Sequence, residues 1–361
     1  MSETEDQTDA KIEGTAPAGH SDVHIEQHKA QSMADAVKAL NDRKNPLEVD
    51  APEPPKYAFK VDDETLEDLI FKYCRDLTAL ARAGKFDPIT GRDDEIYQLK
   101  MILLQKGRKN AMLQAPAGVG KTALVVGLAQ QVAVGNVPKY LQSARVLDLD
   151  LASMAAGTSS PAEFQERFIP LVKGIAERHS DNRYPPVIMF IDEIHQIMPT
   201  CEGSSYKGLS EVMKPYLTVG DLHVVGATTR DEYRQYVGID PAMDRRFQKI
   251  NLEVPNDEQT VTILEYLRPG YERHYSVKVP DDLLRVIVKL TTEHMRKRYQ
   301  PDKSIMVMDS ALAQYVMDHG NEGQLDLRSV CYVIGKETGL HPGALEGSVK
   351  DGRVITGGGG H

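Results

Sequence analysis

The chain has 361 residues, of which 41% are hydrophobic and 27% charged, and its formal net charge at pH 7 is −10. This composition indicates a globular protein of about two domains, and the acidic balance argues against nucleic-acid binding, which needs a basic surface. No apolar run approaches membrane-spanning length, the N-terminus is acidic where a secretory signal is basic, and the three cysteines stand far apart, which favours a cytoplasmic protein without membrane insertion or a cysteine metal site.

Residues 1–60 differ in composition from the rest of the chain. They hold twelve acidic and seven basic residues, and prolines gather at Pro52, Pro54 and Pro55. These features predict a flexible acidic arm, because such a segment cannot bury enough apolar surface to fold alone. A weakly amphipathic pattern over Val23–Leu40 allows a helix there, either as a docking segment for a partner or as a transient helix in the arm.

From residue 64 onward, helix-like and strand-like patterns alternate. Helix-like patterns cover 64–83, 92–105, 121–135, 162–178, 206–217, 257–267 and 281–297. Strand-like runs cover Ala111–Gln114, Arg145–Leu151, Val187–Ile191, Leu222–Ala227 and Lys249–Val254. This alternation predicts an α/β fold with a parallel five-stranded sheet flanked by helices over residues 61–256. The strands then stop, so we expect a small helical domain with a linker-like helix over 257–345 and a flexible tail over 346–361.

A phosphate-binding loop is predicted between the run at 111–114 and the next helix. The loop ends in Gly-Lys-Thr, as in nucleotide-binding loops, although Ala115 stands where the full signature has glycine. We expect Lys121 to reach the β- and γ-phosphates and the Thr122 hydroxyl to hold Mg²⁺. Taken alone, the run also fits an ordinary strand-to-helix turn. The residues expected to contact the nucleotide here are Ala117, Gly118, Val119, Gly120, Lys121, Thr122 and Ala123.

A second motif is the apolar run Val187–Ile191, which ends in Asp192 and Glu193. A strand buried on both faces has this composition, and its carboxyl end would share a sheet edge with the phosphate loop. Asp192 is then expected to bind Mg²⁺ through water, and Glu193 to activate the water that attacks the γ-phosphate. A buried strand that merely ends in a solvated acidic turn is the alternative. Together the two motifs predict a site that hydrolyses ATP with Mg²⁺.

With these residues in place, the chain resembles the first ATPase module of the class 1 Clp chaperones, the ClpA/ClpB type of AAA+ protein, from about residue 72 to about residue 345. The resemblance rests on KYCRDLT and GKFDPITGRDDEI before the sheet, on VVGATTRDEYRQY at 224–236, on AMDRRFQ at 242–248 and on YQPDKSI at 299–305. It implies an AAA+ P-loop NTPase fold. By this resemblance, Ile89 and Thr90 enclose the adenine and Ile305 closes over the nucleotide.

The resemblance also assigns residues to hydrolysis. Thr229 occupies the position that reads the γ-phosphate and positions water. Arg245 and Arg246 match paired arginine fingers, whose planar cations would stabilise phosphoryl charge on the nucleotide of a neighbouring subunit; alone, the pair is an ordinary surface feature. The resemblance thus implies a homo-hexamer that forms with ATP. His195 is expected to be a packed or hydrogen-bonded structural residue rather than a catalyst or metal ligand.

The chain departs from the Clp pattern at the first pore loop, the segment that grips the polypeptide in that family. Ser160, between Ser159 and Pro161, stands at the position of the aromatic residue on the first pore loop. Serine lacks the apolar area and ring face that would hold a chain, so vigorous unfolding by threading is not favoured. Tyr206, in the second pore-loop stretch, either substitutes in part or packs against its own helix.

The departures also concern whole segments. Within the sequence there is no substrate-receiving domain before the module, no coiled-coil insertion and no second ATPase ring, so docking to a protease is not expected. The predicted function is ATP-driven remodelling or (dis)assembly of a protein partner or complex. The alternatives are an ATP-gated oligomeric scaffold with slow turnover, or an AAA+ ATPase that serves a secretion complex or DNA transposition or replication. The acidic charge weakens the DNA alternative.

Overall fold

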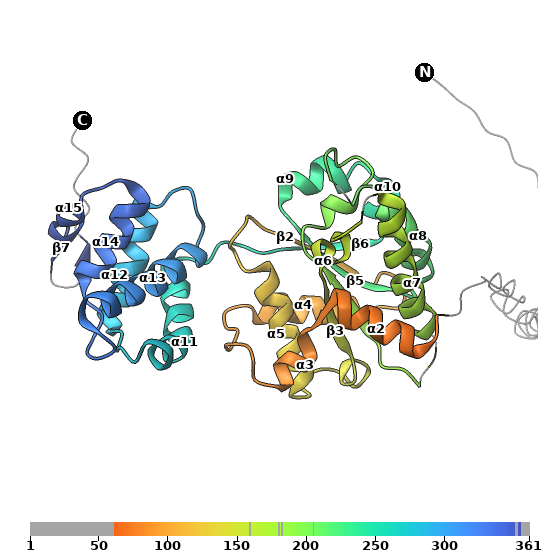
Figure 1. Ribbon diagram of the computed structural model, residues 1–361, viewed down its shortest axis with the longest axis horizontal. Helices are drawn as coiled ribbons and strands as arrows, with labels where there is room; N and C mark the ends of the chain where they lie inside the picture. The colour runs from red at the N-terminus through yellow and green to blue at the C-terminus, as the bar shows by residue number, and fades with distance from the viewer. Residues whose placement is uncertain are drawn as a thin grey trace, which may run out of the picture. The chain divides into compact units, whose positions relative to one another are not determined.

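The computed structural model describes residues 61–158, 160–179, 181, 183–204, 206–350 and 353–354. The predicted arm at 1–60, with its amphipathic stretch, lies outside the described residues. The structure is shown in Figure 1, and the elements are named by its labels.

A six-stranded sheet forms the centre of the part that precedes residue 255 (Figure 1). The strands lie in the order β1-β3-β4-β5-β2-β6, and each neighbouring pair from β3 to β6 is parallel. The predicted α/β class with five parallel strands is therefore confirmed. The parallel strands are β2 (Asn110–Gln114), β3 (Arg145–Leu149), β4 (Val187–Ile191), β5 (His223–Thr228) and β6 (Phe247–Asn251).

The sixth strand corrects the prediction of five strands and of one helix over 64–83. That range contains α2 (Asp63–Tyr73), the short strand β1 (Cys74–Asp76) and α3 (Leu77–Arg82). β1 pairs antiparallel with the edge of β3. The Asp76 carboxylate also accepts the Ala79 N–H at 2.9 Å and so caps the new helix. The pairing and the cap satisfy backbone groups that a continuous helix would have used, which is why the helix divides here.

Helices cover both faces of the sheet, as Figure 1 shows for α7 and α8 on one side and α3 and α5 on the other. Successive strand residues point to opposite faces: Met189 and Ile191 belong to the apolar core under α2, α6, α7 and α8, whereas Ile188 and Phe190 belong to the core under α3, α4 and α5. Besides α2 and α3, these helices are α4 (Asp93–Leu103), α5 (Lys121–Ala133), α6 (Leu151–Ala155), α7 (Pro161–His179) and α8 (Leu209–Val219).

Short helical segments surround the strand ends. After β4 comes the 3₁₀ turn η2 (Ile194–Ile197), and after β5 come α9 (Arg230–Glu232), the π-helical turn η3 (Tyr233–Val237) and α10 (Pro241–Asp244). A further 3₁₀ turn, η1 (Lys139–Leu141), precedes β3. These segments place side chains beside the ends of strands rather than on the covering layers.

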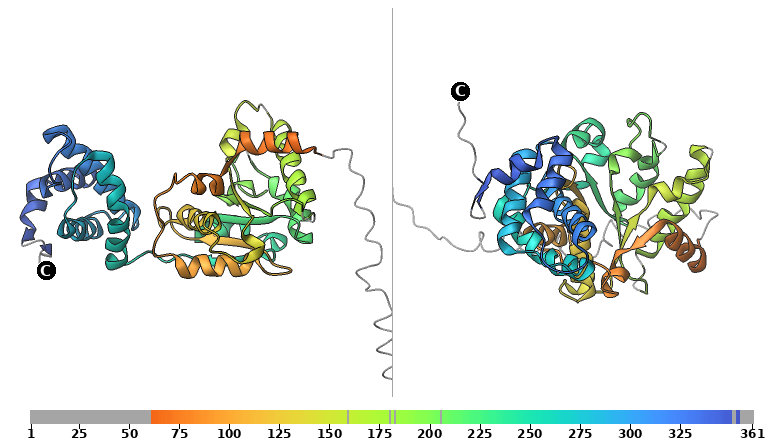
Figure 2. Two further views of the ribbon diagram at one scale, coloured as in Figure 1. Left: turned by 90° about the horizontal axis from the view of Figure 1, so that it is seen from below. Right: turned by 60° about the vertical axis from the view of Figure 1, so that its left-hand side comes forward.

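Beyond residue 255 the chain is mainly helical, with a core of its own that includes Leu264, Ile287 and Leu312 (Figure 2). The helix predicted over 257–267 extends past Pro269 to Tyr275, because Tyr271 and Tyr275 pack against this core. Two short strands, β7 (Val349–Lys350) and β8 (Arg353–Val354), form a hairpin that the sequence pattern did not indicate. The helices are α11 (Asp257–Tyr275), α12 (Asp281–His294), α13 (Asp302–His319), α14 (Leu327–Thr338) and α15 (Pro342–Gly347).

Within the described ranges of both parts, no helix combines the length and the apolar character that crossing a bilayer requires.

Candidate active site

The carboxyl ends of three neighbouring parallel strands meet at one edge of the sheet. β5 lies between β4 and β2, with Ile191 opposite Gly226 and Gln114 opposite Thr228. The segments that leave these strands therefore emerge side by side, at the edge where open α/β sheets bind their ligands. They are the phosphate loop, the acidic pair after β4, and the segment Thr228–Glu232, which we call the sensor segment.

The phosphate loop, Ala115–Gly120, leads from β2 into α5. Gly118 and Gly120 have φ values of 80° and 105°, a region of the backbone map that favours glycine. Ala115 is fully buried and is not among the described residues with positive φ; its N–H donates to the Thr228 carbonyl at 3.3 Å. A methyl group therefore fits without backbone strain, and the alanine is compatible with a phosphate cradle.

The residues that end the loop carry the groups a magnesium–triphosphate complex needs. Lys121 is 7% exposed, and its Nζ donates to the Ala115 carbonyl at 3.1 Å, so the ammonium group is held at the start of the loop. Thr122 Oγ1 donates to Asp192 Oδ2 at 3.0 Å. Hydroxyl and carboxylate oxygens are ligands that Mg²⁺ accepts, and the helix amides with the ammonium group offset phosphate charge. These residues fit the predicted cofactors.

A buried arginine that the sequence did not single out supports the loop. Arg92 is 8% exposed, and its guanidinium donates to the carbonyls of Val119 at 2.9 Å and Glu253 at 3.1 Å. It also forms an ion pair with Glu95 at 2.8 Å. The planar fork of donors thereby ties the loop to the segment after β6. The only local signal was an arginine next to a helix start rich in acidic residues.

An apolar cavity of about 290 Å³ adjoins the loop. Its lining contains Ile89 and Thr90, which are predicted to enclose the adenine, and Ile305, which is predicted to close over the nucleotide, together with Ala123. The Ile89 N–H donates to the Gln130 side-chain carbonyl at 3.3 Å, which fixes the approach of this segment to α5. The sequence missed several apolar members of the lining, namely Phe86, Val126, Ile263 and Leu267. A planar base fits such an apolar cavity.

A second cavity, of about 540 Å³, adjoins the other side of the loop. Ala117 and Thr229 line it, together with Pro116 and Tyr299. The structure thus brings a loop residue and the predicted sensor threonine to one cavity.

Glu193 has a conformation and an environment that suit a base. Its φ of 49° lies in the left-handed region, which is uncommon for residues other than glycine and clusters at functional sites. Its N–H donates to Asp192 Oδ1 at 3.0 Å. Burial, with the nearby charges of Glu232 and Asp192, raises the pKa of the Glu193 carboxyl group. A carboxylate with a raised pKa takes a proton from water more readily.

Thr229 begins α9 as its N-cap. Its Oγ1 accepts the Glu232 N–H at 3.2 Å, while Glu232 Oε2 accepts the Thr229 N–H at 2.9 Å, which is the reciprocal pair of a capping box. Capping uses a lone pair of the hydroxyl oxygen, so the O–H itself can still donate to a phosphate. The residue is therefore held in place and keeps the donor that its predicted role requires.

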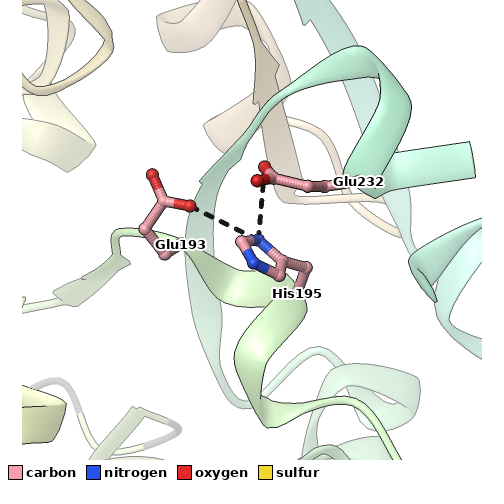
Figure 3. Close-up of side chains that lie close together, drawn as sticks. All are labelled: Glu193, His195 and Glu232. Carbon is pink, nitrogen blue, oxygen red and sulfur yellow. Dashed lines mark ion pairs between the residues drawn. The ribbon is translucent and has the colours of Figure 1, made fainter. Parts of the chain in front are cut away.

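His195 lies between the acidic pair and the sensor segment. It is 8% exposed, and its Nδ1 is 3.1 Å from Thr228 Oγ1. Figure 3 shows Glu193 and Glu232 both directed at this ring nitrogen, with carboxylate oxygens at 3.5 Å and 3.4 Å. The imidazole is thus buried and hydrogen-bonded, as the sequence predicted.

The arginine pair lies at the opposite edge of the sheet. Arg245 is exposed and Arg246 half-buried, and they precede β6, whose first residue Phe247 pairs with Asn110 at the amino end of β2. The phosphate loop leaves the carboxyl end of β2, and a strand of this length spans roughly 16 Å at ~3.3 Å per residue. The structure therefore does not bring the two arginines to the phosphate loop of their own chain.

The two stretches that resemble pore loops carry little free aromatic surface. Tyr206 is half-buried, and its ring packs against Phe164 of α7 with centroids 5.5 Å apart. Neither alternative in the sequence prediction named this contact with α7. Ser160 Oγ accepts the Glu163 N–H at 3.3 Å, as an N-cap of α7 does. Ser159 lies outside the described residues.

Two family models match the chain. The model of the ATPase family associated with various cellular activities (AAA) matches residues 111–254, and the model of the AAA lid domain matches residues 256–330.

Among curated proteins, the chain is similar to the chloroplastic chaperone protein ClpB2 of Oryza sativa subsp. japonica, with 37% identity over 292 residues. It is similar to the chaperone protein ClpB of Aquifex aeolicus with 42% identity over 238 residues. The alignments cover 81% and 66% of this chain, but only 28% and 23% of those two proteins. The matched region is thus one part of each larger chaperone.

Among solved structures, the Saccharomyces cerevisiae Hsp104:casein complex in its extended conformation is similar, with a TM-score of 0.66 and 35% identity. The similarity covers 75% of this chain and 45% of that chain. The similarity to the Clp chaperones is therefore found in the structure as well as in the sequence.

Proposed function

We propose, from the premise that this chain belongs to the Clp type of AAA+ ATPases, that it acts in a ring of identical subunits that uses ATP hydrolysis to remodel a protein partner. The family supplies ATP hydrolysis. The ring and the roles of individual residues are inferred from geometry, and the protein partner is inferred from the similar proteins.

One observation supports the proposal that the subunits form a ring: the sheet separates Arg245 and Arg246 from the phosphate loop of the same chain. Arginines complete a phosphoryl-transfer site when they stabilise charge that develops on the transferred group. In this chain they can do so only for a nucleotide bound by another copy. A closed ring of copies, with six as the expected number, gives every site such a neighbour.

Within each site the residues have distinct roles. Lys121 would bind β- and γ-phosphate oxygens, and the Thr122 hydroxyl directly and Asp192 through water would hold Mg²⁺, which would offset phosphate charge. Glu193 orients the attacking water and accepts its proton. Thr229 donates its O–H to the γ-phosphate while its oxygen continues to cap α9. The base lies in the apolar cavity lined by Ile89 and its neighbours.

The proposed client is a protein, and the proposed action is rearrangement of a specific complex rather than vigorous threading. The similar Hsp104 structure is a complex with casein, which supports a protein client for this module. The loop that would face the client has a small hydroxyl at Ser160, and the Tyr206 ring is engaged with Phe164. Neither offers the free aromatic face that grips an extended chain.

Turnover and assembly test the proposal together. ATP hydrolysis and mass in solution with ATP are measured for the unaltered chain and for Glu193→Gln. We expect turnover and an ATP-dependent ring for the unaltered chain, and a ring with turnover reduced by about 10²-fold or more for Glu193→Gln. A ring without turnover in the unaltered chain favours the alternative, an ATP-gated scaffold. Hydrolysis by a monomer contradicts the ring.

A fluorescent protein with an unstructured tag tests the proposed mode of action. We expect little ATP-dependent unfolding by the unaltered chain and an increase for Ser160→Tyr, because tyrosine adds apolar area and a ring face. Ser143→Tyr, at an exposed serine between η1 and β3, is the matched control for added aromatic surface away from both loops. Rapid unfolding by the unaltered chain contradicts this part of the proposal.

A further inference from the structure

His195 lies beside both the predicted base Glu193 and Glu232 of the sensor segment. Its ring lies in η2, two residues after Glu193, and stacks on Tyr236 of η3 with centroids 5.7 Å apart and planes at 22°. The stacking fixes the plane of the imidazole. Nδ1 therefore faces a set direction, towards carboxylate oxygens of Glu193 and Glu232 (Figure 3).

The hydrogen bonds around this nitrogen establish which atom carries the proton. Glu232 Oε2 accepts the Thr229 N–H at 2.9 Å and the Thr228 O–H at 3.0 Å. Since the Thr228 hydroxyl donates to Glu232, its oxygen can only accept from His195 Nδ1 at 3.1 Å. The imidazole is thus in the tautomer with hydrogen on Nδ1.

One N–H then faces three acceptors. Thr228 Oγ1 lies at 3.1 Å, Glu232 Oε2 at 3.4 Å and Glu193 Oε2 at 3.5 Å from the same nitrogen. A single donor cannot satisfy all three at full strength, so a bond gained by one oxygen weakens the others. The position of the sensor segment consequently affects how firmly Glu193 is held.

We propose that His195 is a positioning residue that couples the carboxylate of Glu193 to the sensor segment through its shared Nδ1–H. The inference rests on the proposed roles of Glu193 and Thr229 in hydrolysis. The Glu232 carboxylate accepts the Thr229 N–H at 2.9 Å and lies 3.4 Å from His195 Nδ1, so γ-phosphate binding by Thr229 would alter the share of the Nδ1–H available to Glu193. Glu193 is then aligned for catalysis only when Thr229 of the sensor segment has bound the γ-phosphate.

The charges around Glu193 explain why its carboxylate needs the hydrogen bond from His195. Glu193 lies near two other carboxylates, those of Glu232 and Asp192, and like charges this close repel one another. Without the imidazole N–H, the carboxylates of Glu193 and Glu232 lose the donor that lies within 3.5 Å of both. If Glu193 rotated away from this position, ATP affinity would be unchanged, but the carboxylate would activate water poorly.

The choice of substitutions separates the coupling from packing. Asparagine carries its amide nitrogen on Cγ, as histidine carries Nδ1, whereas glutamine is closer to histidine in size but places its nitrogen one bond farther out. We compare His195→Asn and His195→Gln with His195→Ala, using His274→Gln, at an exposed histidine of α11, as the control. ATP affinity, kcat, KM and thermal midpoint are measured for each oligomer.

We expect His195→Ala and His195→Gln to lower kcat by about 10-fold to 100-fold, because a hydrogen bond to a charged group is lost. KM for ATP should stay within about two-fold, since ground-state binding is unaffected. His195→Asn should recover most of the lost kcat, and His274→Gln should resemble the unaltered chain.

Equal losses for His195→Asn and His195→Gln that track the thermal midpoint would overturn the proposal in favour of packing. An unchanged kcat in His195→Ala would overturn it outright. Glu232→Gln provides a second measure: its effect on kcat should be smaller in the His195→Ala background than alone, and additive effects would contradict coupling. If the unaltered chain does not hydrolyse ATP, the proposed function fails instead, so the two failures are distinguishable.

Discussion

The two edges of the central sheet differ in how their functional side chains are held. At the carboxyl edge, Lys121, Thr122 and Asp192 bond to one another or to the loop. At the amino edge, Arg245 is exposed, and Arg246 is half-buried. The carboxyl edge thus holds a fixed nucleotide-binding half-site, and the amino edge presents a cationic half-site outward. On the proposed function, a chain built in this way needs a second copy to complete its catalytic site.

The short helix α10, which directly precedes the two arginines, is nevertheless held by side-chain contacts at both ends; we call these contacts the brace. Asp244, the last residue of α10, accepts the Tyr233 O–H at 2.5 Å and pairs with Lys249 at 3.1 Å. At the other end of α10, Asp240 pairs with Lys214 of α8 at 2.7 Å. Arg245 and Arg246 therefore directly follow a short helix whose two ends are both held by side-chain contacts.

The largest expected effect comes from removing the outward half-site. Arg245→Ala with Arg246→Ala should lower turnover by about 10³-fold or more, as loss of an arginine finger does. ATP affinity, measured by titration with a fluorescent nucleotide, should change by less than about three-fold, because the arginines do not contact the nucleotide of their own chain. The matched control is Arg273→Ala, at an exposed arginine of α11. A large loss of affinity would place the arginines in their own site.

A smaller effect concerns acid stability at the amino edge. His223, which begins β5, is fully buried, and its two ring nitrogens have no hydrogen-bond partner among the described residues. Burial, with His179 and Lys109 nearby, lowers the pKa of His223 from 6.5 to about 3. Protonation therefore favours the unfolded chain. The free energy of unfolding therefore keeps its full value above pH 6.5 and decreases as the pH falls towards 3. At pH 5 the decrease is about 2 kcal/mol.

Urea unfolding at pH 7 and pH 5 measures this loss. His223→Leu should reduce the difference in unfolding free energy between the two pH values by about 2 kcal/mol. His319→Leu, at an exposed histidine of α13, should leave the difference unchanged. Equal pH dependence in the unaltered chain and His223→Leu would show that His223 does not titrate as described.

The smallest expected effect comes from loosening the brace. Tyr233→Phe removes the hydroxyl that binds Asp244 and should lower turnover by about 5-fold to 10-fold, since a bond to a charged group is lost. ATP affinity should be unchanged. Tyr266→Phe, at an exposed tyrosine of α11, is the control. A loss of affinity equal to the loss of turnover would show that Tyr233 supports the nucleotide site rather than the arginines.

The sequence predicts those parts of the fold and site that local pattern determines. β4 has the predicted bounds because five apolar residues stand between Pro186 and Asp192. The phosphate loop is identifiable for the same reason, since its glycines and Gly-Lys-Thr ending are contiguous. The two motifs converge because both come directly after parallel strands of one sheet.

The remaining parts depend on partners distant in sequence. β1 is a strand only because it pairs with β3, more than 70 residues later; Cys74–Asp76 has no strand pattern of its own. Arg92 reaches carbonyls 27 and 161 residues away, so no local motif reveals it. The position of the arginine pair relative to the phosphate loop likewise depends on the order of strands in the sheet.

Mixing two inactive chains tests most directly whether each site is completed by a second copy. One chain carries Glu193→Gln and keeps its arginines, and the other carries Arg245→Ala with Arg246→Ala and keeps Glu193. In mixed rings at equal proportions, about a quarter of the interfaces combine an intact Glu193 with intact arginines from the neighbour. We therefore predict recovery of about a quarter of the unaltered turnover. Mixed rings, verified by mass, that are no more active than either chain alone would contradict the account.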